Sequence, residues 1–299
     1  MKVVVSGATG LIGRVLVEQL TADGHTIIAL SRSPERADLA GIDVRSWDPL
    51  AGPPSLDALE GADAVVHLAG EPIVAHRWSE SQKKVIHDSR VLSTTNLVRG
   101  ISIATSKPEV FVSGSAVGYY GDRGDEQLEE NSAPGTGFLT DVCRDWEASA
   151  ARASEFGVRV VMIRTGVVLS NKGGALQKML PPFKLGVGGP LGSGRQWFPW
   201  IHISDIAGIF RHAIRTRQLK GPVNGVGPEP VTNAEFTREL ARRLRKPAFL
   251  AVPEFALRAL MGEMADVLFY SQRVLPAAAL STGYEFYYPI LSKALENLL

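Results

Sequence analysis

The stretch VVVSGATGLIG, residues 3 to 13, contains the pattern from which we predict the fold of this chain. Three consecutive valines indicate a buried strand, and Gly7, Gly10 and Gly13 follow before an apolar helical pattern begins. Glycines at this spacing permit a tight turn, a close approach of the backbone to a ligand, and close packing of a helix on a strand. The stretch therefore predicts a strand, a glycine turn and a helix in direct succession.

The start of the predicted helix has the properties of an anion site. The backbone N–H groups of Leu11 and Ile12 have no partner within the helix, and the Thr9 hydroxyl can join them. A diphosphate is the anion that this turn accommodates in dinucleotide-binding proteins. The stretch thus predicts a dinucleotide site, with an unliganded tight turn in an α/β fold as the alternative.

Short β-branched runs alternate with longer helical patterns through the first half of the chain. Strands are expected within 2–7, 26–31, 62–70, 109–115 and 158–169, and helices within 14–24, 81–101 and 134–150. Each run is apolar on both faces and each long connection can hold a helix, which favours parallel strands with crossover helices. We therefore predict an α/β fold, a doubly wound parallel sheet of the Rossmann type with a smaller α+β C-terminal domain.

The second half has a different composition. Residues 173–200 are rich in glycine and proline, so we expect mostly loop. Beyond them we expect a helix with a capping box from Thr232 to Glu235, one helix over 253–276, a short strand over 282–289 and a final helix. The expected division is a dinucleotide-binding domain over 1–170, with a returning segment near 200–225, and a substrate or cap domain over 171–299.

Composition excludes several classes of protein. The chain has 299 residues, and its 32 basic residues nearly cancel its 31 acidic ones, so a nucleic-acid partner is not expected. Cys143 is the only cysteine and the six histidines show no ligand spacing, so neither a disulfide nor a metal site is expected. No apolar run is long enough for a signal peptide or a membrane span. We expect a cytoplasmic protein without a membrane partner.

The end of the second predicted strand indicates the cofactor. Many NAD enzymes place an acidic residue there to bind the ribose 2′-hydroxyl, but this chain has Ser31, Arg32 and Ser33. A planar guanidinium can hold a 2′-phosphate through two hydrogen bonds, so the sequence favours NADP. The alternative is a surface arginine in an exposed turn.

Several longer strings resemble one protein family. The strings GATGLIG, AVVHLAG, VFVSGSAVGYYG and WIHISDIAGIF are similar, in order and spacing, to the extended short-chain dehydrogenase/reductase superfamily, also called the NAD(P)-dependent epimerase/dehydratase family. The strings FLTDVCRDWEA, LGVGGPLGSGRQWFPWIHISD and GYEFYYP resemble its atypical branch of "epimerase family proteins", the YfcH-like group with its own C-terminal domain. The resemblance covers nearly the whole chain.

The resemblance implies further cofactor contacts. It places the backbone of Leu68, Ala69 and Gly70 against the cofactor and brings the segment around Val167 to the nicotinamide. Arg90, on the helix that follows, is a candidate phosphate ligand. The alternative for Arg90 is a salt bridge to a neighbouring helix.

The resemblance also implies a catalytic relay of Ser, Tyr and Lys, in which the last two share one helix face. Ser115 fits the first role. With Glu147 as the acidic residue four positions after the Lys, Leu139 and Cys143 occupy the Tyr and Lys positions. Neither can replace its counterpart, because leucine has no proton to give and a thiol carries no positive charge.

A proton donor must then come from elsewhere. Tyr119 and Tyr120 follow Ser115 closely, and we select Tyr119, with packing against the Gly-rich loop as the alternative. A catalytic Cys143 is less favoured than a buried apolar one. His202 is expected to order a strand-to-helix junction.

Three functions compete on this basis. The first is an NADP-dependent oxidoreductase acting on a small carbonyl or hydroxyl compound, with Ser115 and Tyr119 as catalytic residues. The second is a non-catalytic NADPH-binding sensor or regulator, which the absent Tyr-x-x-x-Lys pair favours. The third, a nucleotide-sugar epimerase or dehydratase, depends on the resemblance alone.

Overall fold

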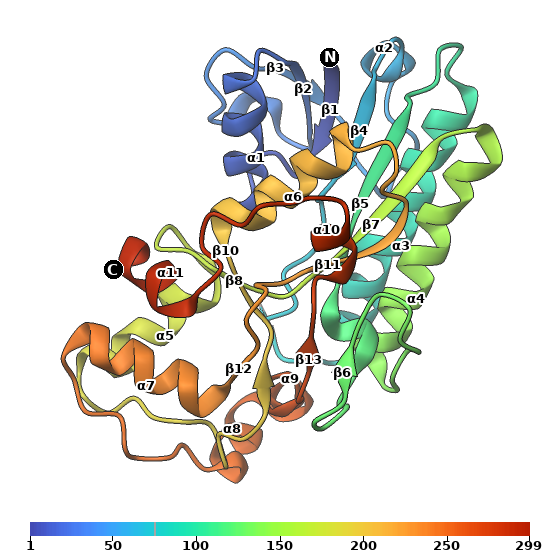
Figure 1. Ribbon diagram of the computed structural model, residues 1–299. Helices are drawn as coiled ribbons and strands as arrows, with labels where there is room; N and C mark the ends of the chain where they lie inside the picture. The colour runs from blue at the N-terminus through green and yellow to red at the C-terminus, as the bar shows by residue number, and fades with distance from the viewer. Residues whose placement is uncertain (75) are drawn as a thin grey trace.

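Apolar runs that alternate with helical patterns form a seven-stranded parallel sheet at the centre of the molecule (Figure 1). The computed structural model describes residues 1–74 and 76–299. Across the sheet the strands are β3 (Asp43–Ser46), β2 (Thr26–Ser31), β1 (Lys2–Ser6), β4 (Ala64–His67), β5 (Val110–Ala116), β7 (Arg159–Thr165) and β11 (Gly221–Gly225). Every neighbouring pair is parallel, which requires crossover connections. The predicted doubly wound sheet of the Rossmann type is confirmed.

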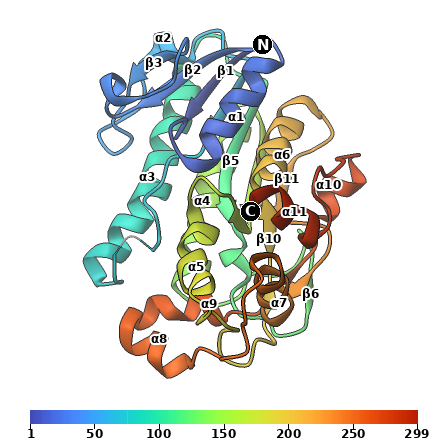
Figure 2. The same ribbon diagram turned by 90° about the vertical axis from the view of Figure 1, so that its left-hand side faces the viewer.

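Helices cover both faces of the sheet, as the two views in Figures 1 and 2 show. The main ones are α1 (Leu11–Ala22) and α6 (Ile203–Arg215) on one face, and α3 (Glu80–Ile103) and α4 (Phe138–Ala151) on the other. Successive strand residues point to opposite faces. Val3 and Val5 therefore pack in the core layer of α1 and α6, whereas Val4 packs in the layer of α3. All three valines are fully buried.

The strand order reverses at β1, which pairs with β2 on one side and β4 on the other. In open α/β sheets a crevice forms beyond the carboxyl ends of the strands at this point. The glycine turn of residues 7–10 directly follows β1. The fold thus brings the predicted dinucleotide turn to the switch point of the sheet.

The remaining elements are short and lie mostly in the second half of the chain. The helices are α2 (Leu56–Leu59), α5 (Gly174–Lys184), α7 (Asn233–Leu244), α8 (Glu254–Met261), α9 (Asp266–Phe269), α10 (Ala277–Ser281) and α11 (Leu291–Leu298). The 3-10 turns are η1 (Pro34–Arg36), η2 (Val117–Tyr120), η3 (Arg152–Phe156) and η4 (Gly262–Ala265). Three two-stranded sheets pair β8 (Val167–Leu169) with β10 (Trp200–His202), β9 (Trp197–Phe198) with β12 (Val231–Thr232), and β6 (Gln127–Leu128) with β13 (Arg273–Val274). Residues 203–225 return to the main sheet and supply α6 and β11.

Two expectations for residues 173–276 differ from the structure, and a third difference follows in the C-terminal tail. Residues 173–200, expected to be mostly loop, contain α5, which includes Pro181 and Pro182. The single helix expected over 253–276 is interrupted at Gly262, whose φ of 66° ends α8, and α9 and β13 follow. A left-handed residue cannot continue a right-handed helix, although the apolar periodicity persists beyond it. The capping box of Thr232 and Glu235 at the start of α7 is present.

Residues 282–289 form no strand but return along α6. The carboxylate of Asp205 accepts hydrogen bonds from the backbone N–H groups of Tyr287 at 2.7 Å and Tyr288 at 3.0 Å. The Tyr284 hydroxyl also donates to the Asp205 backbone carbonyl at 3.0 Å. Asp205 is fully buried, so these donors replace its hydration. The tail is therefore held by a side chain and not by a strand ladder.

His202 orders the start of α6. Its Nδ1 accepts a hydrogen bond from the Ser204 N–H at 3.1 Å, and its Nε2 lies 3.1 Å from the Asn297 Oδ1. Burial lowers the pKa of His202 to about 4, so the ring is neutral at pH 7. The residue caps a helix and joins it to the C-terminal helix α11.

Candidate functional site

The glycine turn admits no side chain at its first position. Gly7 has a φ of 71°, and a Cβ built on it would lie 2.7 Å from the backbone of both Leu68 and Ala69. A Cβ on Gly13 would lie 2.1 Å from the Gly7 carbonyl oxygen, and one on Gly10 would lie 3.1 Å from it. The turn is therefore pressed against the loop that follows β4 and against the first turn of α1.

The N-terminus of α1 is open to an anion. Gly10 is the N-cap, so no side chain caps the helix, and the first turn contains no acidic residue. The N–H groups of Leu11, Ile12 and Gly13 belong to the first turn, where an α-helix provides no internal acceptor. These donors and the helix dipole favour a phosphate at this end.

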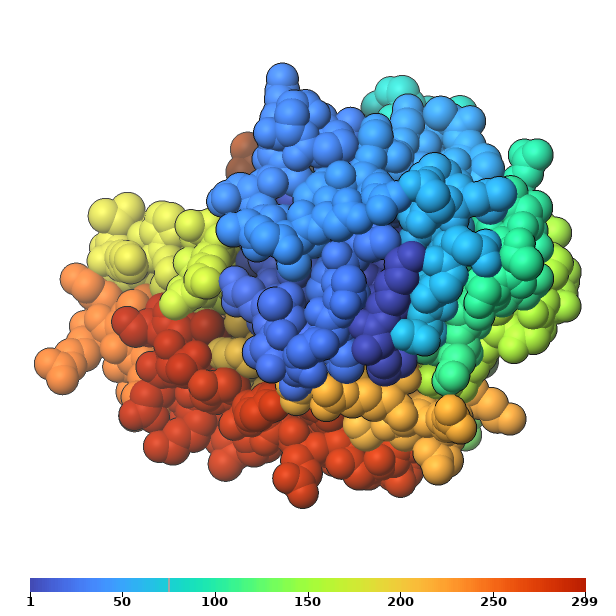
Figure 3. Space-filling view, turned by 90° about the horizontal axis from the view of Figure 1, so that it is seen from above, coloured from blue at the N-terminus to red at the C-terminus, as the bar shows by residue number. Residues whose placement is uncertain are grey.

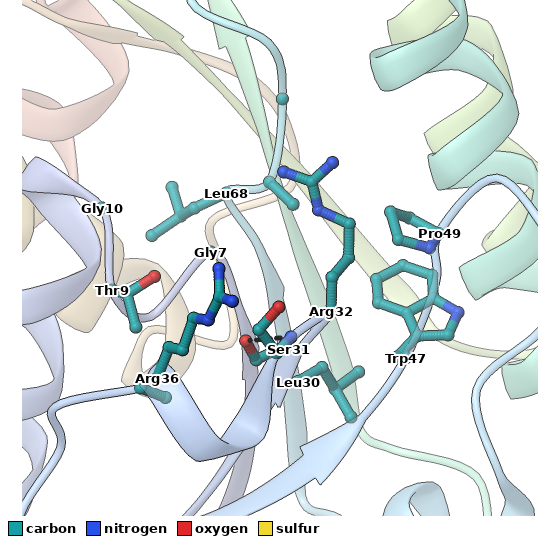
Figure 4. A pocket seen from close by; sticks show the side chains of 14 residues that line it. Gly7, Thr9, Gly10, Leu30, Ser31, Arg32, Arg36, Trp47, Pro49 and Leu68 are labelled. Atoms are coloured by element: carbon teal, nitrogen blue, oxygen red, sulfur yellow. Dashed lines mark hydrogen bonds between the residues drawn. The ribbon is translucent and has the colours of Figure 1, made fainter.

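A cavity of about 360 Å³ lies beside this turn (Figure 4). Its walls come from the glycine turn, the end of β2, the segment that follows it, the end of β3 and the loop after β4. The lining residues are Gly7, Thr9, Gly10, Leu30, Ser31, Arg32, Ser33, Arg36, Ala37, Trp47, Pro49, Leu68, Ala69 and Gly70. Eight of the residues predicted to bind the cofactor are therefore brought together in one cavity: Gly7, Thr9, Gly10, Ser31, Arg32, Leu68, Ala69 and Gly70.

Two guanidinium groups reach the cavity beyond β2. Arg32 forms no salt bridge within the described residues, and Arg36 contacts only Glu35, at 3.8 Å, with both side chains largely exposed. Such surface pairs contribute little free energy, so both cations are available to a ligand. The Ser33 N–H donates to the Ser31 Oγ at 3.2 Å and shapes the turn between them. This arrangement can hold a phosphate ester.

Sequence reasoning missed part of this cavity. Arg36 stands four residues after Arg32 in SRSPER, and the turn η1 returns it toward the glycine turn, as Figure 4 shows. Trp47 and Pro49, at the end of β3, form an apolar wall beside Arg32. An aromatic residue at the end of the third strand is a signal that could have indicated this wall.

Arg90 approaches the loop after β4 from α3. A Cβ built on Gly70 would lie 3.5 Å from the Arg90 Cζ, and the guanidinium packs over the Trp146 ring with its Cζ 5.4 Å from the ring centroid. Its Nη1 donates to the Ile86 carbonyl at 3.1 Å and to the Ser89 Oγ at 3.4 Å. Burial lowers the pKa of Arg90. No carboxylate of the described residues forms a salt bridge with it, so the alternative of an interhelical salt bridge is not observed there.

A buried histidine supports the same loop from below. His67, fully buried at the end of β4, lies between the Ser6 Oγ at 2.5 Å and the Ser93 Oγ at 3.0 Å. Burial lowers the pKa of His67 to about 3, so the ring is neutral at pH 7. The contacts connect β1, β4 and α3 directly beneath the cavity.

Ser115 belongs to a buried polar network. Its Oγ donates to the Glu147 Oε1 at 2.7 Å, and Arg164 binds the same carboxylate with Nε to Oε1 and Nη2 to Oε2, both at 2.8 Å. Ser115 is only 4% exposed and does not line the cavity. Because an ionised carboxylate only accepts, the Ser115 proton points toward Glu147 and its lone pairs remain available.

The two tyrosines after Ser115 have different surroundings. The Tyr120 hydroxyl donates to the Asn224 Oδ1 at 2.7 Å and accepts from the Arg164 Nη1 at 3.0 Å, and burial raises its pKa to about 12. Tyr119 is half-buried, and its ring packs against Arg164 with the Cζ 3.5 Å from the centroid. Tyr119 is therefore the freer of the two phenols, and Arg164 connects it to Ser115 through Glu147.

The helix α4 carries no acid or base at the predicted relay positions. A Cβ built on Gly118 would lie 3.3 Å from the Leu139 Cβ and 3.7 Å from the Cys143 Sγ, so both face η2. The thiol is buried beside the Ala116 carbonyl at 3.6 Å, and burial raises the pKa of Cys143 to about 12. The thiol stays protonated near neutral pH and is not a nucleophile.

Val167 lies outside the cavity, in the short strand β8. Its N–H donates to the Pro199 carbonyl at 2.7 Å, and its register partner is Trp200 of β10. A Cβ on the preceding Gly166 would lie 2.2 Å from the same carbonyl. The chain therefore crosses tightly here, just beyond β7.

Within residues 1–74 and 76–299, no group of three or more His, Cys, Asp or Glu side chains is placed to hold a metal ion. No helix in the same residues has both the length and the apolar character needed to cross a membrane.

Comparisons with known proteins agree with this geometry. The profile of the NAD dependent epimerase/dehydratase family matches residues 3–226, and a domain of unknown function, DUF1731, matches residues 252–298. The Arabidopsis thaliana protein "Epimerase family protein SDR39U1 homolog, chloroplastic" is 43% identical over 311 residues, which cover 100% of this chain and 87% of the relative. Human "Epimerase family protein SDR39U1" is 39% identical over 303 residues that cover both chains completely.

Solved structures show the same similarity. The human epimerase family protein SDR39U1 (isoform 2), solved with NADPH, has a TM-score of 0.90 at 38% identity and covers 100% of this chain and 99% of its own. The nucleoside-diphosphate sugar epimerase from Corynebacterium glutamicum has a TM-score of 0.82 at 40% identity, and the match covers 100% of this chain and 58% of that one. UDP-glucuronic acid 4-epimerase from Bacillus cereus, at 18% identity and a TM-score of 0.79, shares the fold.

These matches span the glycine turn, the sheet and the C-terminal elements, and they confirm the resemblance found in the sequence. The chain belongs to the NAD-dependent epimerase/dehydratase family.

Proposed function

We propose that this chain binds NADPH at the switch point of its sheet and is an oxidoreductase acting on a small carbonyl or hydroxyl compound. The observation that carries the proposal is the pair of available guanidinium groups, Arg32 and Arg36, in one cavity with the open N-terminus of α1. Two separate anion sites on one cavity match the diphosphate and the 2′-phosphate of NADPH. The bound cofactor would supply or accept a hydride.

The residues of the turn fit such a cofactor. Gly7 has no Cβ, so the loop after β4 packs directly against the turn, and both line the cavity. In the proposed complex Leu11, Ile12 and Gly13 donate N–H groups to the diphosphate. On the adenosine side of the cofactor, the proposed ligands of the 2′-phosphate are Ser31, Arg32 and Arg36. The NADP preference rests on charge: Arg32 directly follows β2, where many NAD enzymes place an acidic residue.

The second half of the cofactor lies, in this proposal, along Leu68–Gly70 toward Arg90. Arg90 supports this placement because its guanidinium lies beside Gly70 without a carboxylate partner in the described chain. Even a partly buried cation loses hydration, and a ligand phosphate would supply the negative charge that Arg90 lacks. Arg90 is therefore proposed as a phosphate ligand, and Val167 as a neighbour of the nicotinamide.

For the chemical step we propose Ser115 and Tyr119. The Ser115 proton is directed to Glu147, so its oxygen can accept a hydrogen bond from a substrate hydroxyl. Tyr119 is the proposed proton donor and acceptor, and the cation of Arg164 against its ring connects it electrostatically to the same network.

A second candidate is a non-catalytic NADPH-binding protein. The observation in its favour is the helix α4, where Leu139 and the buried Cys143 provide no group that exchanges a proton near pH 7. A nucleotide-sugar epimerase or dehydratase is the third candidate. It draws on the description of the Corynebacterium glutamicum relative, but it meets the same lack of a proton relay on α4.

The cofactor is tested by fluorescence titration with NADPH and NADH. Arg32→Ala and Arg36→Ala should each weaken NADPH binding by about tenfold or more, because each loses a charge-assisted contact, and should leave NADH binding unchanged. Arg99→Ala, an exposed arginine on α3, is the matched control. Equal losses for the two cofactors would contradict the NADP assignment.

Turnover separates the first two candidates. NADPH consumption with any member of a carbonyl library, lost in Ser115→Ala, supports the oxidoreductase. Tight NADPH binding with no consumption across the whole library supports the sensor.

We further propose a cytoplasmic location, which the single cysteine supports because it leaves no intrachain disulfide. Fractionation of the source cells tests it, and recovery only from an organelle would contradict it.

A further inference from the structure

The most exposed large apolar side chains of the described residues lie in the second half of the chain. Phe249 is 80% exposed, and Leu185 and Phe255 are each 77% exposed. These are the three highest values among the large apolar side chains of the described residues. Val187 and Leu250 are both 57% exposed. Exposed apolar side chains that are contiguous on a surface mark a site of interaction with another molecule.

Two loops that are far apart in the sequence carry four of these side chains. We call residues 184–187 and 245–250 the apolar tip. The Val252 N–H donates to the Pro190 carbonyl at 2.8 Å, and the Gly192 N–H donates to the Val252 carbonyl at 2.9 Å. A Cβ on Gly189 would lie 1.7 Å from the Leu250 carbonyl oxygen, so the two backbones touch. The loops are therefore held side by side, and Figure 3 shows the yellow-green and orange parts of the chain together at its left-hand edge.

The tip is positively charged. It contains Lys184, Arg245 and Lys246, all exposed, and none of the three forms a salt bridge within the described residues. Neither loop contains Asp or Glu, and residues 156–204 contain none at all. Because the whole chain has a formal net charge of only +1, this charge is a local feature.

Protruding apolar groups among unpaired cations suit one kind of surface. At the interface of an anionic bilayer, apolar side chains enter the boundary of the acyl chains while lysine and arginine meet the phosphates. A second copy of the tip would bring like charges together, which opposes self-association through this surface. Charge complementarity therefore favours an anionic lipid surface over another copy of the chain.

We propose that the apolar tip binds the surface of an anionic membrane, with Leu185 and Phe249 inserted and Lys184, Arg245 and Lys246 at the headgroups. This differs from the expectation of no membrane partner, which depended on the absence of a long apolar segment. A peripheral contact needs none, because the fold assembles it from two short loops. None of the tip residues lines the cofactor cavity, so the proposal goes beyond the proposed function and does not depend on it.

The test is co-sedimentation of the full chain with two kinds of vesicle. One contains phosphatidylcholine alone and the other contains equal amounts of phosphatidylcholine and phosphatidylglycerol. The wild type should bind the second and not the first. Leu185→Ser with Phe249→Ser should weaken binding by about tenfold or more, through lost apolar insertion. Lys184→Gln with Lys246→Gln should weaken it by about tenfold, and added salt should act in the same direction.

Matched variants on other surfaces serve as controls. Ile103→Ser with Leu280→Ser removes two exposed apolar side chains elsewhere, and Arg99→Gln with Lys220→Gln removes two exposed cations elsewhere. Both should bind vesicles like the wild type, and every variant should unfold at the wild-type urea midpoint. Absence of binding to anionic vesicles, or equal losses in the control variants, would overturn the proposal. Sedimentation without lipid provides a further check. If the wild type is an oligomer and Leu185→Ser with Phe249→Ser makes it a monomer, the membrane proposal is overturned and the tip mediates self-association.

Discussion

The guanidinium of Arg164 on β7 donates two hydrogen bonds of 2.8 Å to the carboxylate of Glu147 on α4. Both side chains are buried, and the carboxylate also accepts the Ser115 hydroxyl. Removing one member of such a pair leaves a buried charge without its partner. We predict that Arg164→Met lowers the free energy of unfolding by about 3–5 kcal/mol, measured by urea denaturation.

The control for this prediction is an exposed pair. Arg217→Met removes the contact between Arg217 and Glu109, which is 3.4 Å long and largely exposed, and should cost less than about 1 kcal/mol. Similar losses in the two variants would show that the buried pair is no more important than a surface one.

The two neutral histidines predict how stability depends on pH. Burial lowers the pKa of His67 to about 3 and that of His202 to about 4, from an ordinary value of 6.5. Below pH 6.5 the unfolded chain therefore binds protons that the folded chain does not. Each histidine should reduce stability by up to about 1.4 kcal/mol per pH unit as the pH falls from 6.5 toward 4.

Urea midpoints measured at several pH values check this slope. His67→Asn should flatten it, whatever its effect on absolute stability at pH 7. His76→Asn, which replaces an exposed histidine, serves as the matched control. An unaltered slope in His67→Asn would mean that another group is responsible for the acid sensitivity.

Substitutions at two glycines can separate the cost of backbone strain from the cost of a steric clash. Gly7 and Gly24 both have positive φ, 71° and 78°, but a Cβ on Gly7 meets backbone at 2.7 Å whereas one on Gly24 meets nothing within 4 Å. Gly24→Ala should therefore cost only about 1 kcal/mol, from strain alone. Gly7→Ala should cost more than that and should abolish detectable NADPH binding, measured by denaturation and titration. Wild-type NADPH affinity in Gly7→Ala would exclude the turn as the cofactor site.

Arg90 predicts a trade between binding and stability. Its guanidinium is partly buried beside Gly70 without a carboxylate partner in the described chain, so the folded protein gains little from its charge. Arg90→Met keeps the packing on Trp146 and should not lower the urea midpoint, yet should weaken NADPH binding by about tenfold or more. A lower midpoint with unchanged NADPH affinity would instead give Arg90 a structural role.

Local patterns made the centre of the fold predictable. The glycines of residues 7–13, the β-branched runs and the cation at Arg32 each act within a few residues of one another, so the sequence displays them directly. Eight of the residues predicted to bind the cofactor line one cavity, and their role there stays a prediction. The break at Gly262 cannot be read from the sequence, because the apolar periodicity continues through the positive φ that ends α8.

Features that depend on tertiary contacts cannot be predicted from local sequence patterns. The family resemblance implies the role of Ser115, but the direction of its hydroxyl toward Glu147 depends on how α4 packs on β5. Arg36 reaches the cavity only because η1 turns the chain back. The roles of Ser115, Tyr119 and Val167 stay predictions, since no geometry on these side chains decides the chemistry.

The contact between Asp205 and the returning tail couples two parts of the fold that are distant in the sequence. Tyr284, Tyr287 and Tyr288 provide the donors around this buried carboxylate. If the tail detached, α6 would keep a buried carboxylate without these donors, which is costly in free energy. The tail and the start of α6 should therefore open together, and their amide hydrogens should exchange with solvent at the same rate.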